Sequence, residues 1–215
     1  MTRAIRIGVT GKIGSGKSTL LRMMTERGIE VVNTDQLAKE LMQGDPSLQA
    51  RIAELIGAAA YRDGKLDRGF VASQIFQDAE KRQMLEAIVH PAVMQAVDEV
   101  FRRSQPGKMV AVESAILLQL DLDTDFDYII LVDTPDDAVI ARLAASGRVT
   151  EEDARKRLAE QHWETVHRSE ADFVVENYGT EAEFEKRCAA LLAMLNALAL
   201  RPLPEEPLRS IEEEE

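Results

Sequence analysis

The feature that most constrains the fold of this chain is the segment at residues 11–18, which reads GKIGSGKS. It fits the pattern G-x-x-x-x-G-K-[ST] at every fixed position, a match that average residue usage produces by chance in roughly one chain of this length in a few hundred. A short apolar run over 3–10 precedes the segment, and a helical pattern over 17–27 follows it. A strand, a glycine-rich loop and a helix in this order aim backbone N–H groups and a helix N-terminus at one place, which favours phosphate binding there.

The residue types within this loop suit a nucleoside triphosphate with Mg²⁺. Gly14 and Gly16 allow the backbone to approach phosphate closely. Lys17 is placed to reach the β and γ phosphates, and the Ser18 hydroxyl is a ligand for Mg²⁺. The alternative, a glycine-rich turn with a structural role alone, fits this placement poorly. The loop by itself leaves open a switch, a motor, a pump or a kinase.

Four further apolar segments predict the rest of a sheet, because each is short and ends in a polar turn. They cover residues 29–32, 109–112, 128–132 and 173–175. Since helical patterns separate the strands, we expect an α/β fold. It would be a five-stranded parallel sheet with helices on both faces, of the P-loop NTP hydrolase type.

Two insertions interrupt the predicted core. We assign residues 1–35, 108–141 and 169–200 to the P-loop core, 36–107 to a helical insertion, 142–168 to a lid and 201–215 to a flexible acidic tail. The first insertion is too long for a plain crossover connection between strands, so we expect it to form a subdomain of its own.

Local signals predict where helices begin and break within the insertions. The helical patterns of the first insertion cover 46–56, 67–76 and 80–103. We expect a break between helices at His90-Pro91, because the residue before proline avoids the helical conformation. In the lid, Thr150 precedes three acidic residues and resembles an N-cap.

The composition excludes several classes of protein. The chain has 38 acidic and 26 basic residues and a net charge of −12, so it lacks the broad basic surface of a nucleic-acid binder. No apolar run approaches the roughly 20 residues that a membrane span requires. The single cysteine, Cys188, excludes an intramolecular disulfide framework. We therefore expect a cytoplasmic protein that acts on small molecules, without nucleic-acid or membrane partners.

Several charged residues outside the loop are candidates for chemistry. Asp35 follows the second predicted strand and is placed to accept a proton from an acceptor hydroxyl or to cap a helix over 36–42, two roles that do not exclude each other. Glu113 ends the third predicted strand, where it would orient Mg²⁺ through water or pair with a lysine. Arg142 and Arg148 fall in the lid, and would either stabilise a transferring phosphoryl group on closure or remain solvated on a helix face.

The chain resembles the dephospho-coenzyme A kinase family over nearly its whole length, to about residue 200. The segments that carry the resemblance are 7–11 running into 13–19, 28–29 with 31–35, 63–68, 75–76, His90-Pro91, 112–117 and 171–179. The resemblance implies a core, a lid and a helical acceptor-binding domain. It also implies an enzyme that phosphorylates the ribose 3′-hydroxyl of dephospho-coenzyme A with ATP and Mg²⁺, which is the last step of coenzyme A synthesis.

The resemblance further implies roles for individual residues. Catalysis would fall to Asp35 as the base, with Lys17 and Arg142. ATP would be bound by Gly11, Ile13, Gly14, Ser15, Gly16, Lys17, Ser18, Thr19, Asn177 and Gly179, of which the last two would lie by the adenine. Ser18 would bind Mg²⁺. The acceptor would be bound by Asp35, Lys65, Arg68 and His90.

Several positions depart from the commonest pattern of that family, among them three in and near the expected site and the second lid arginine, which is displaced to Arg148. Lys12 stands in place of a second glycine in the loop, Asn33 in place of the first aspartate of an Asp-x-Asp pair, and Gln119 in place of a glutamate. Two other functions stay open from the residues alone. The chain would be a related kinase for another small hydroxyl acceptor, or a non-catalytic, nucleotide-sensing switch. A guanine-specific switch is disfavoured, because neither N-K-x-D nor D-x-x-G occurs.

Overall fold

A computed structural model of the chain describes residues 3–76, 78–114, 117, 125–145, 147, 149–161 and 168–200. The predicted acidic tail, 201–215, and the lid arginine Arg148 lie outside the described residues. None of the helices among the described residues combines the length and the apolar character that crossing a membrane requires.

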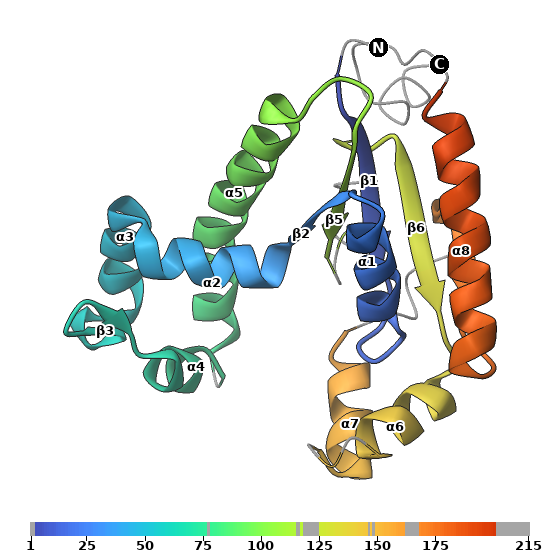
Figure 1. The fold of residues 1–215 in the computed structure, drawn as a ribbon. Helices are drawn as coiled ribbons and strands as arrows, with labels where there is room; N and C mark the ends of the chain where they lie inside the picture. Colours follow the sequence, from blue (N-terminus) through green and yellow to red (C-terminus); the bar gives the residue numbers. More distant parts are fainter. Residues whose placement is uncertain are drawn as a thin grey trace. The chain divides into compact units, whose positions relative to one another are not determined.

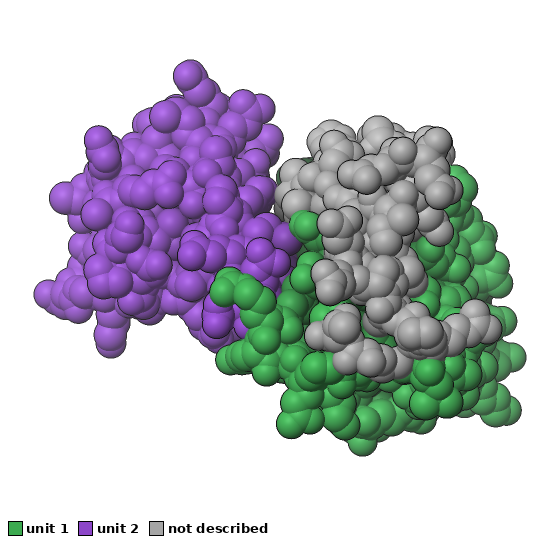
Figure 2. Space-filling view, turned by 90° about the horizontal axis from the view of Figure 1, so that it is seen from above, with its two compact units in different colours: residues 1–32, 101–215 green, residues 33–100 purple. Residues whose placement is uncertain are grey.

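The chain divides into two compact units, which Figure 2 shows in different colours. Unit 1 comprises residues 1–32 and 101–215, and unit 2 comprises residues 33–100. The helix α5, Ala79–Arg103, begins in unit 2, and its last residues belong to unit 1.

Unit 1 is built on a five-stranded sheet in the order β2-β5-β1-β6-β7 (Figure 1). The strands are β1 (Ile5–Thr10), β2 (Glu30–Asn33), β5 (Met109–Glu113), β6 (Tyr128–Asp133) and β7 (Phe173–Glu176). β1 pairs in parallel with β5 and β6, and β6 pairs in parallel with β7. The predicted α/β class and five-stranded parallel sheet are confirmed. The carboxyl ends of parallel strands meet at one edge of a sheet, and ligands of α/β proteins bind beyond that edge.

Two helices cover one face of this sheet, α1 (Lys17–Glu26) and α8 (Glu181–Leu198). The alternate β1 residues Ile5, Ile7 and Val9 are buried there. The residues that α1 and α8 contribute to the same apolar core are Leu20, Met23, Met24, Phe184, Cys188, Leu191, Leu192 and Leu195. The buried α8 residues recur every three or four positions, so they form one apolar stripe that packs against the sheet.

The opposite face of β1 has a smaller aromatic cluster. The Arg6 guanidinium stacks 4.8 Å from the centroid of the Phe101 ring, at the end of α5. Phe101 in turn meets Phe126 edge to face, with 6.0 Å between ring centroids. Arg3 and Asp127 form a bidentate ion pair beside this cluster, with both hydrogen bonds at 2.7 Å. Phe101, near the end of α5, thus packs on the face of β1 opposite α1 and α8.

A helical hairpin follows β6 and consists of α6 (Asp136–Ala145) and α7 (Glu151–Ala159). The two helices share a small core of Val139, Ile140, Ala154 and Leu158. The Thr150 hydroxyl accepts a hydrogen bond from the Asp153 N–H, which confirms the predicted N-cap of α7.

Unit 2 consists of helices and one short hairpin. The helices are α2 (Thr34–Gly44), α3 (Pro46–Ile56), α4 (Arg68–Phe76) and most of α5. The antiparallel pair β3 (Tyr61–Arg62) and β4 (Lys65–Leu66) is joined by Asp63 and Gly64. Both turn residues have positive φ, 51° and 72°, as a two-residue hairpin turn that matches the twist of its strands requires.

The predicted break at His90-Pro91 is wrong, because α5 continues through Pro91. A proline inside a helix removes one backbone hydrogen bond and crowds the preceding turn. The flanking residues Leu85, Val89, Val93 and Val97 recur every four positions and are all buried. This continuous apolar stripe stabilises the helix on both sides of the proline, so the local preference of the residue before proline is overridden.

Candidate nucleotide-binding site

The loop between β1 and α1 has the conformation that its glycines permit. Gly11 has φ 148° and Gly16, the N-cap of α1, has φ 108°, in the region that side chains with a Cβ rarely adopt. A Cβ atom on Gly16 would lie 2.4 Å from Asn177 Nδ2, and one on Gly11 would lie 2.6 Å from the Val132 carbonyl oxygen. The two glycines are therefore required both by the turn and by the close approach of the next strands.

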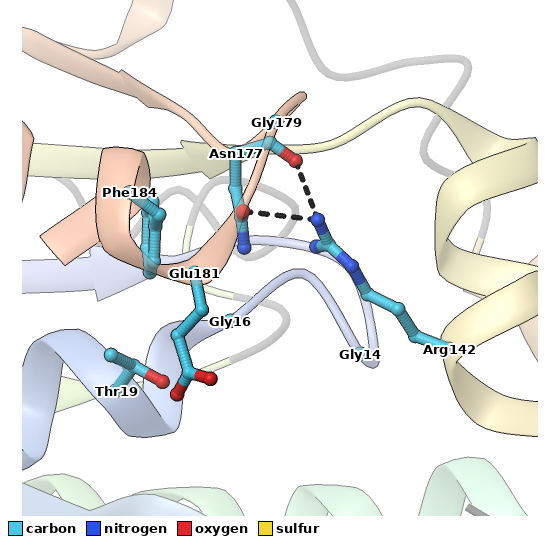
Figure 3. Close-up of a pocket in the computed structure, with 8 residues that line it drawn as sticks. All are labelled: Gly14, Gly16, Thr19, Arg142, Asn177, Gly179, Glu181 and Phe184. Carbon is cyan, nitrogen blue, oxygen red and sulfur yellow. Dashed lines mark hydrogen bonds between the residues drawn. The ribbon is translucent and has the colours of Figure 1, made fainter. Parts of the chain in front are cut away.

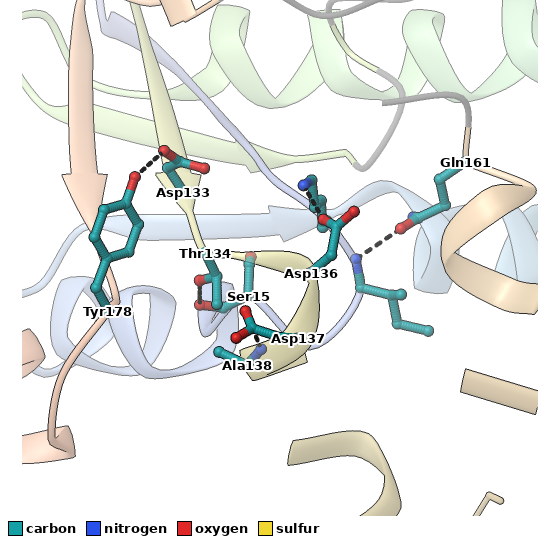
Figure 4. Close-up of polar contacts among 10 residues, drawn as sticks. Ser15, Asp133, Thr134, Asp136, Asp137, Ala138, Gln161 and Tyr178 are labelled. Atoms are coloured by element: carbon teal, nitrogen blue, oxygen red, sulfur yellow. Dashed lines mark hydrogen bonds and ion pairs between the residues drawn. The ribbon is translucent and has the colours of Figure 1, made fainter. Parts of the chain in front are cut away.

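Two side chains from outside the loop hold its centre in place. The Ser15 carbonyl oxygen accepts hydrogen bonds from Asn177 Nδ2 at 2.7 Å and from Thr134 Oγ1 at 2.9 Å. Thr134 follows β6 and Asn177 follows β7, so the ends of two neighbouring strands fix the loop (Figure 4 shows Thr134 and Ser15). The buried Ser15 hydroxyl has no hydrogen-bond partner among the described residues. An unsatisfied buried hydroxyl next to these glycines fits a loop shaped for a polar ligand.

The outer edge of the loop is held by the hairpin of α6 and α7. Lys12 Nζ donates a hydrogen bond to the carboxylate of Asp136, the first residue of α6. The Ile13 N–H donates to Gln161 Oε1 at 2.8 Å, just after α7 (Figure 4). These two contacts connect the first half of the loop to the hairpin that contains most of the predicted lid.

The loop lysine, Lys17, faces the loop backbone and the end of β5. Its Nζ donates to the carbonyl oxygens of Gly11 at 2.6 Å and Lys12 at 3.1 Å. It also lies 3.6 Å from Oε1 of Glu113, a residue that is only 8% exposed. Of the two roles that the sequence left open for Glu113, the structure shows the pairing with a lysine.

A cavity of about 270 Å³ adjoins the loop on the side of α8 (Figure 3). Its lining combines loop glycines with residues from the start of α1, from α6, from the segment after β7 and from the start of α8. The lining residues are Gly14, Gly16, Thr19, Arg142, Asn177, Gly179, Glu181 and Phe184. The two residues predicted to lie by the adenine, Asn177 and Gly179, thus line one cavity with part of the loop.

Arg142 lies on the opposite side of this cavity from α8, as Figure 3 shows. Its Nη2 donates to the backbone oxygen and to Oδ1 of Asn177, both at 3.0 Å. Its buried Nη1 has no partner among the described residues. The structure therefore places Arg142 against Asn177 at the cavity.

A second polar cluster lies beside the Asn177 segment. The Tyr178 hydroxyl donates to Asp133 Oδ2 at 2.5 Å, and Arg168 donates to the same hydroxyl at 3.2 Å. The pKa of Tyr178 is raised, mainly by the hydrogen bond to Asp133 and secondarily by burial. The cluster ties the segment after β7 to the end of β6 (Figure 4).

The residues present fit a Mg²⁺ ion that binds together with phosphate. Ser18 is exposed in the first turn of α1, and no described residue forms a hydrogen bond with its hydroxyl. Within the described part of the chain, no three His, Cys, Asp or Glu residues are grouped so that they could hold a metal ion. A hydroxyl with oxygens from phosphate and water is the ligand set that Mg²⁺ prefers, and it does not need a cage of protein carboxylates.

The candidate acceptor residues all lie in unit 2, on four separate elements. Asp35 is exposed in the first turn of α2, Lys65 is in β4, Arg68 begins α4, and His90 is half-buried in α5. No hydrogen bond or ion pair joins these four side chains, all of which the structure describes.

The interpretation of Asp35 as an N-cap is wrong. The N-cap of α2 is Asn33, whose Oδ1 accepts a hydrogen bond from the Gln36 N–H at 2.8 Å. The helix begins two residues earlier than predicted, because Asn33 has the extended backbone that an N-cap requires. The Asp35 carboxylate is thus not used to cap the helix.

Sequence reasoning missed several residues that shape this site, among them Thr134, Asp136 and Gln161. Thr134 is polar and directly follows a buried strand that neighbours β1, which is a usable signal once the strand order is known. Gln161 gave no signal, because its role depends on how the α6–α7 hairpin packs.

Three comparisons place the chain among known proteins. A family model described as dephospho-CoA kinase matches residues 5–183. Dephospho-CoA kinase of Chlorobaculum tepidum is 40% identical, over 84% of this chain and 90% of that protein. Dephospho-CoA kinase of Thermobifida fusca is 33% identical, over 86% of this chain and 93% of that protein.

A solved structure is similar to this chain in both fold and sequence. The crystal structure of a Thermus thermophilus protein has a TM-score of 0.75 and 31% identity, over 90% of this chain and 99% of that one. The family model spans both the phosphate loop of unit 1 and all of unit 2. The chain belongs to the dephospho-CoA kinase family.

Proposed function

We propose that this protein transfers the γ-phosphoryl group of ATP to the ribose 3′-hydroxyl of dephospho-CoA, which yields CoA and ADP. The observation that carries the proposal is that the phosphate loop and the cavity share Gly14 and Gly16. One nucleotide with its phosphates on the loop would therefore have its base in the cavity. The acceptor, dephospho-CoA, is inferred from the family to which the chain belongs.

On the donor side, the loop N–H groups and the N-terminus of α1 would bind the phosphates. In this proposal Gly11, Ile13, Ser15 and Thr19 complete the ATP site with the residues of the cavity. Lys17 would exchange its bonds to two backbone carbonyls for bonds to the β and γ phosphates. Those carbonyls hold the ammonium group beside the loop before the nucleotide arrives.

Mg²⁺ would be held by the Ser18 hydroxyl and the phosphates, and it would neutralise charge on the γ-phosphoryl group. Glu113 would keep its place as the counterion of Lys17.

On the acceptor side, Asp35 would act as the general base. The 3′-hydroxyl oxygen forms a bond to the γ phosphorus, the bond to the β–γ bridging oxygen breaks, and the hydroxyl proton passes to the Asp35 carboxylate. Lys65, Arg68 and His90 would bind the acceptor, and the basic side chains of Lys65 and Arg68 are suited to its phosphates.

Arg142 would contact the nucleotide from the side of the predicted lid. To reach the transferring phosphoryl group, as the sequence predicts, its guanidinium would exchange Asn177 for phosphate oxygens. In its present place it forms one wall of the cavity, where its planar group can pack on a base.

The test is an assay with ATP, Mg²⁺ and dephospho-CoA in which ADP release is coupled to a colour change and the product is identified by mass. We expect a product heavier than dephospho-CoA by one phosphoryl group, and no product from CoA, whose 3′-hydroxyl is already phosphorylated. ADP release that does not depend on the acceptor would overturn the proposal. The cytoplasmic location stays a prediction from the sequence.

A further inference from the structure

Two lysines carry the positive charge of the phosphate loop, and each has a carboxylate partner from outside it. Lys17 lies 3.6 Å from Glu113, at the end of β5. Lys12 forms a hydrogen-bonded ion pair with Asp136, at the start of α6. The loop pattern requires a lysine at position 17 but not at position 12. The second lysine therefore needs an explanation of its own.

Lys12 lies at the end of the loop where the terminal phosphate is expected. The Lys17 Nζ donates to the Lys12 carbonyl oxygen at 3.1 Å, so the backbone of Lys12 is next to the group that reaches the β and γ phosphates. Gly14, Gly16 and Thr19 line the cavity proposed for the base, whereas Lys12 does not. A triphosphate that extends from the cavity along the loop thus ends near Lys12.

The ion pair with Asp136 is one that phosphate can displace. The Asp136 side chain is 61% exposed and that of Lys12 is 22% exposed. Ion pairs with so solvated a carboxylate contribute little to stability. A phosphate group offers the same ammonium group more negative charge and several acceptor oxygens.

We propose that Lys12 is a second phosphate-contacting residue, which exchanges the Asp136 carboxylate for the γ-phosphate of the bound nucleoside triphosphate. The inference rests on the proposed function, because it requires a triphosphate on this loop. Asp136 holds the ammonium group at the edge of the loop until the nucleotide binds. The alternative is a purely structural tie between the loop and α6, which already meet where Gly14 packs against Leu143.

The two interpretations differ in what removal of each partner does. We would measure the affinity of Lys12→Ala and Asp136→Asn for a non-hydrolysable ATP analogue and for ADP, each with Mg²⁺, by calorimetry. Lys12→Ala removes a charge-assisted hydrogen bond to the γ-phosphate. We therefore expect its affinity for the ATP analogue to fall about tenfold and its affinity for ADP to change by less than about twofold. Asp136→Asn removes a competitor for the ammonium group, so the ATP analogue should bind as tightly as before or more tightly.

The inference is overturned if Lys12→Ala lowers the affinity for both nucleotides equally. It is also overturned if Asp136→Asn lowers the affinity for the ATP analogue as much as Lys12→Ala does. Lys156→Ala is the matched control, because Lys156 forms an exposed ion pair with Glu152 in α7 of the same hairpin. This variant should bind both nucleotides as the unmodified protein does.

Failure of the inference can be told apart from failure of the proposed function. If the unmodified protein phosphorylates dephospho-CoA and Lys12→Ala binds the ATP analogue normally, only the role of Lys12 is lost. If the unmodified protein binds the ATP analogue in a Lys12-dependent way but transfers nothing to dephospho-CoA, the proposed acceptor is lost and the role of Lys12 is retained.

Discussion

The side-chain amide of Asn177 donates a hydrogen bond to the Ser15 carbonyl oxygen over 2.7 Å, although 162 positions separate the two residues. The same side chain accepts a hydrogen bond from Arg142 through its oxygen. Both ends of the amide are thus used, one for the phosphate loop and one for α6. Asn177 connects the three parts of the chain that surround the cavity. Its substitution should therefore impair nucleotide binding more than substitution of a residue that only lines the cavity.

We predict that Asn177→Ala raises the KM for ATP by about tenfold and leaves the KM for dephospho-CoA nearly unchanged. The substitution frees the Ser15 carbonyl from one of its two donors and removes a partner of Arg142, each a bond of about 1 kcal/mol or more. Steady-state kinetics with each substrate varied in turn would measure both constants. Thr134→Val is the control, because it removes only the other donor to the Ser15 carbonyl and should raise the KM for ATP less. Equal effects of the two variants would contradict the central role of Asn177.

Cys188 gives a prediction for stability at alkaline pH. The thiol is fully buried in the core between α8 and the sheet, and burial raises its pKa from 9.0 to about 11. A group whose folded-state pKa is raised contributes stability below its unfolded pKa and loses it as the pH rises through the folded value. The free energy of unfolding should therefore fall between pH 9 and about 11 by up to about 3 kcal/mol on account of this thiol.

Urea unfolding of the unmodified protein and of Cys188→Ala at several pH values would isolate this contribution. Other groups titrate in both proteins, so the difference between the two curves reports the thiol. The alanine variant is expected to start less stable at pH 7, because a buried sulfur is lost, and to lose less stability above pH 9. Two parallel curves would show that the thiol does not titrate differently in the folded state.

Local sequence signals predicted much of the fold. The strand, loop and helix at the N-terminus were predictable because one contiguous segment contains the apolar run, the glycines and the helix start. The bounds of α3, 46–56, were predicted correctly, since Asp45 caps the helix and Pro46 occupies its first turn. The break at Pro91 was wrong because the apolar stripe on α5 extends over the whole helix, and a rule about one residue cannot take that into account.

The site was predictable only in part, for a different reason. Residues of the loop carry a pattern, whereas Thr134, Asp136 and Gln161 contact the loop from positions more than a hundred residues away. Their residue types are ordinary, and their place depends on β6 lying next to β1. Glu113 was identified as a candidate because it ends a strand, but its pairing with Lys17 could be decided only from the three-dimensional structure.

The pairing of Lys17 with Glu113 leads to a prediction about magnesium. We expect Lys17→Ala to lower kcat at least about 100-fold, because the lysine stabilises charge on the transferred phosphoryl group. Glu113→Gln should lower kcat less, since Lys17 is still present to bind the phosphates and loses only the carboxylate that lies 3.6 Å from its Nζ. The Mg²⁺ concentration that gives half the maximal rate should be unchanged in Glu113→Gln if the carboxylate serves only the lysine. A shift of several-fold in that concentration would instead assign Glu113 to the metal.

The assignment of Asp35 as the base predicts a separation of chemistry from nucleotide binding. Asn33 caps α2, so Asp35→Asn leaves the N-cap intact and changes little except the basicity of one exposed side chain. We expect kcat to fall by about 10²- to 10⁴-fold, the usual contribution of a general base, with the affinity for ATP unchanged by calorimetry. The control is Asn33→Ala, which removes the cap and should cost about 1 kcal/mol of stability while kcat falls far less. A near-normal kcat in Asp35→Asn would mean that another group accepts the proton. Equal losses in both variants would mean that the start of α2 matters for its shape rather than for its carboxylate.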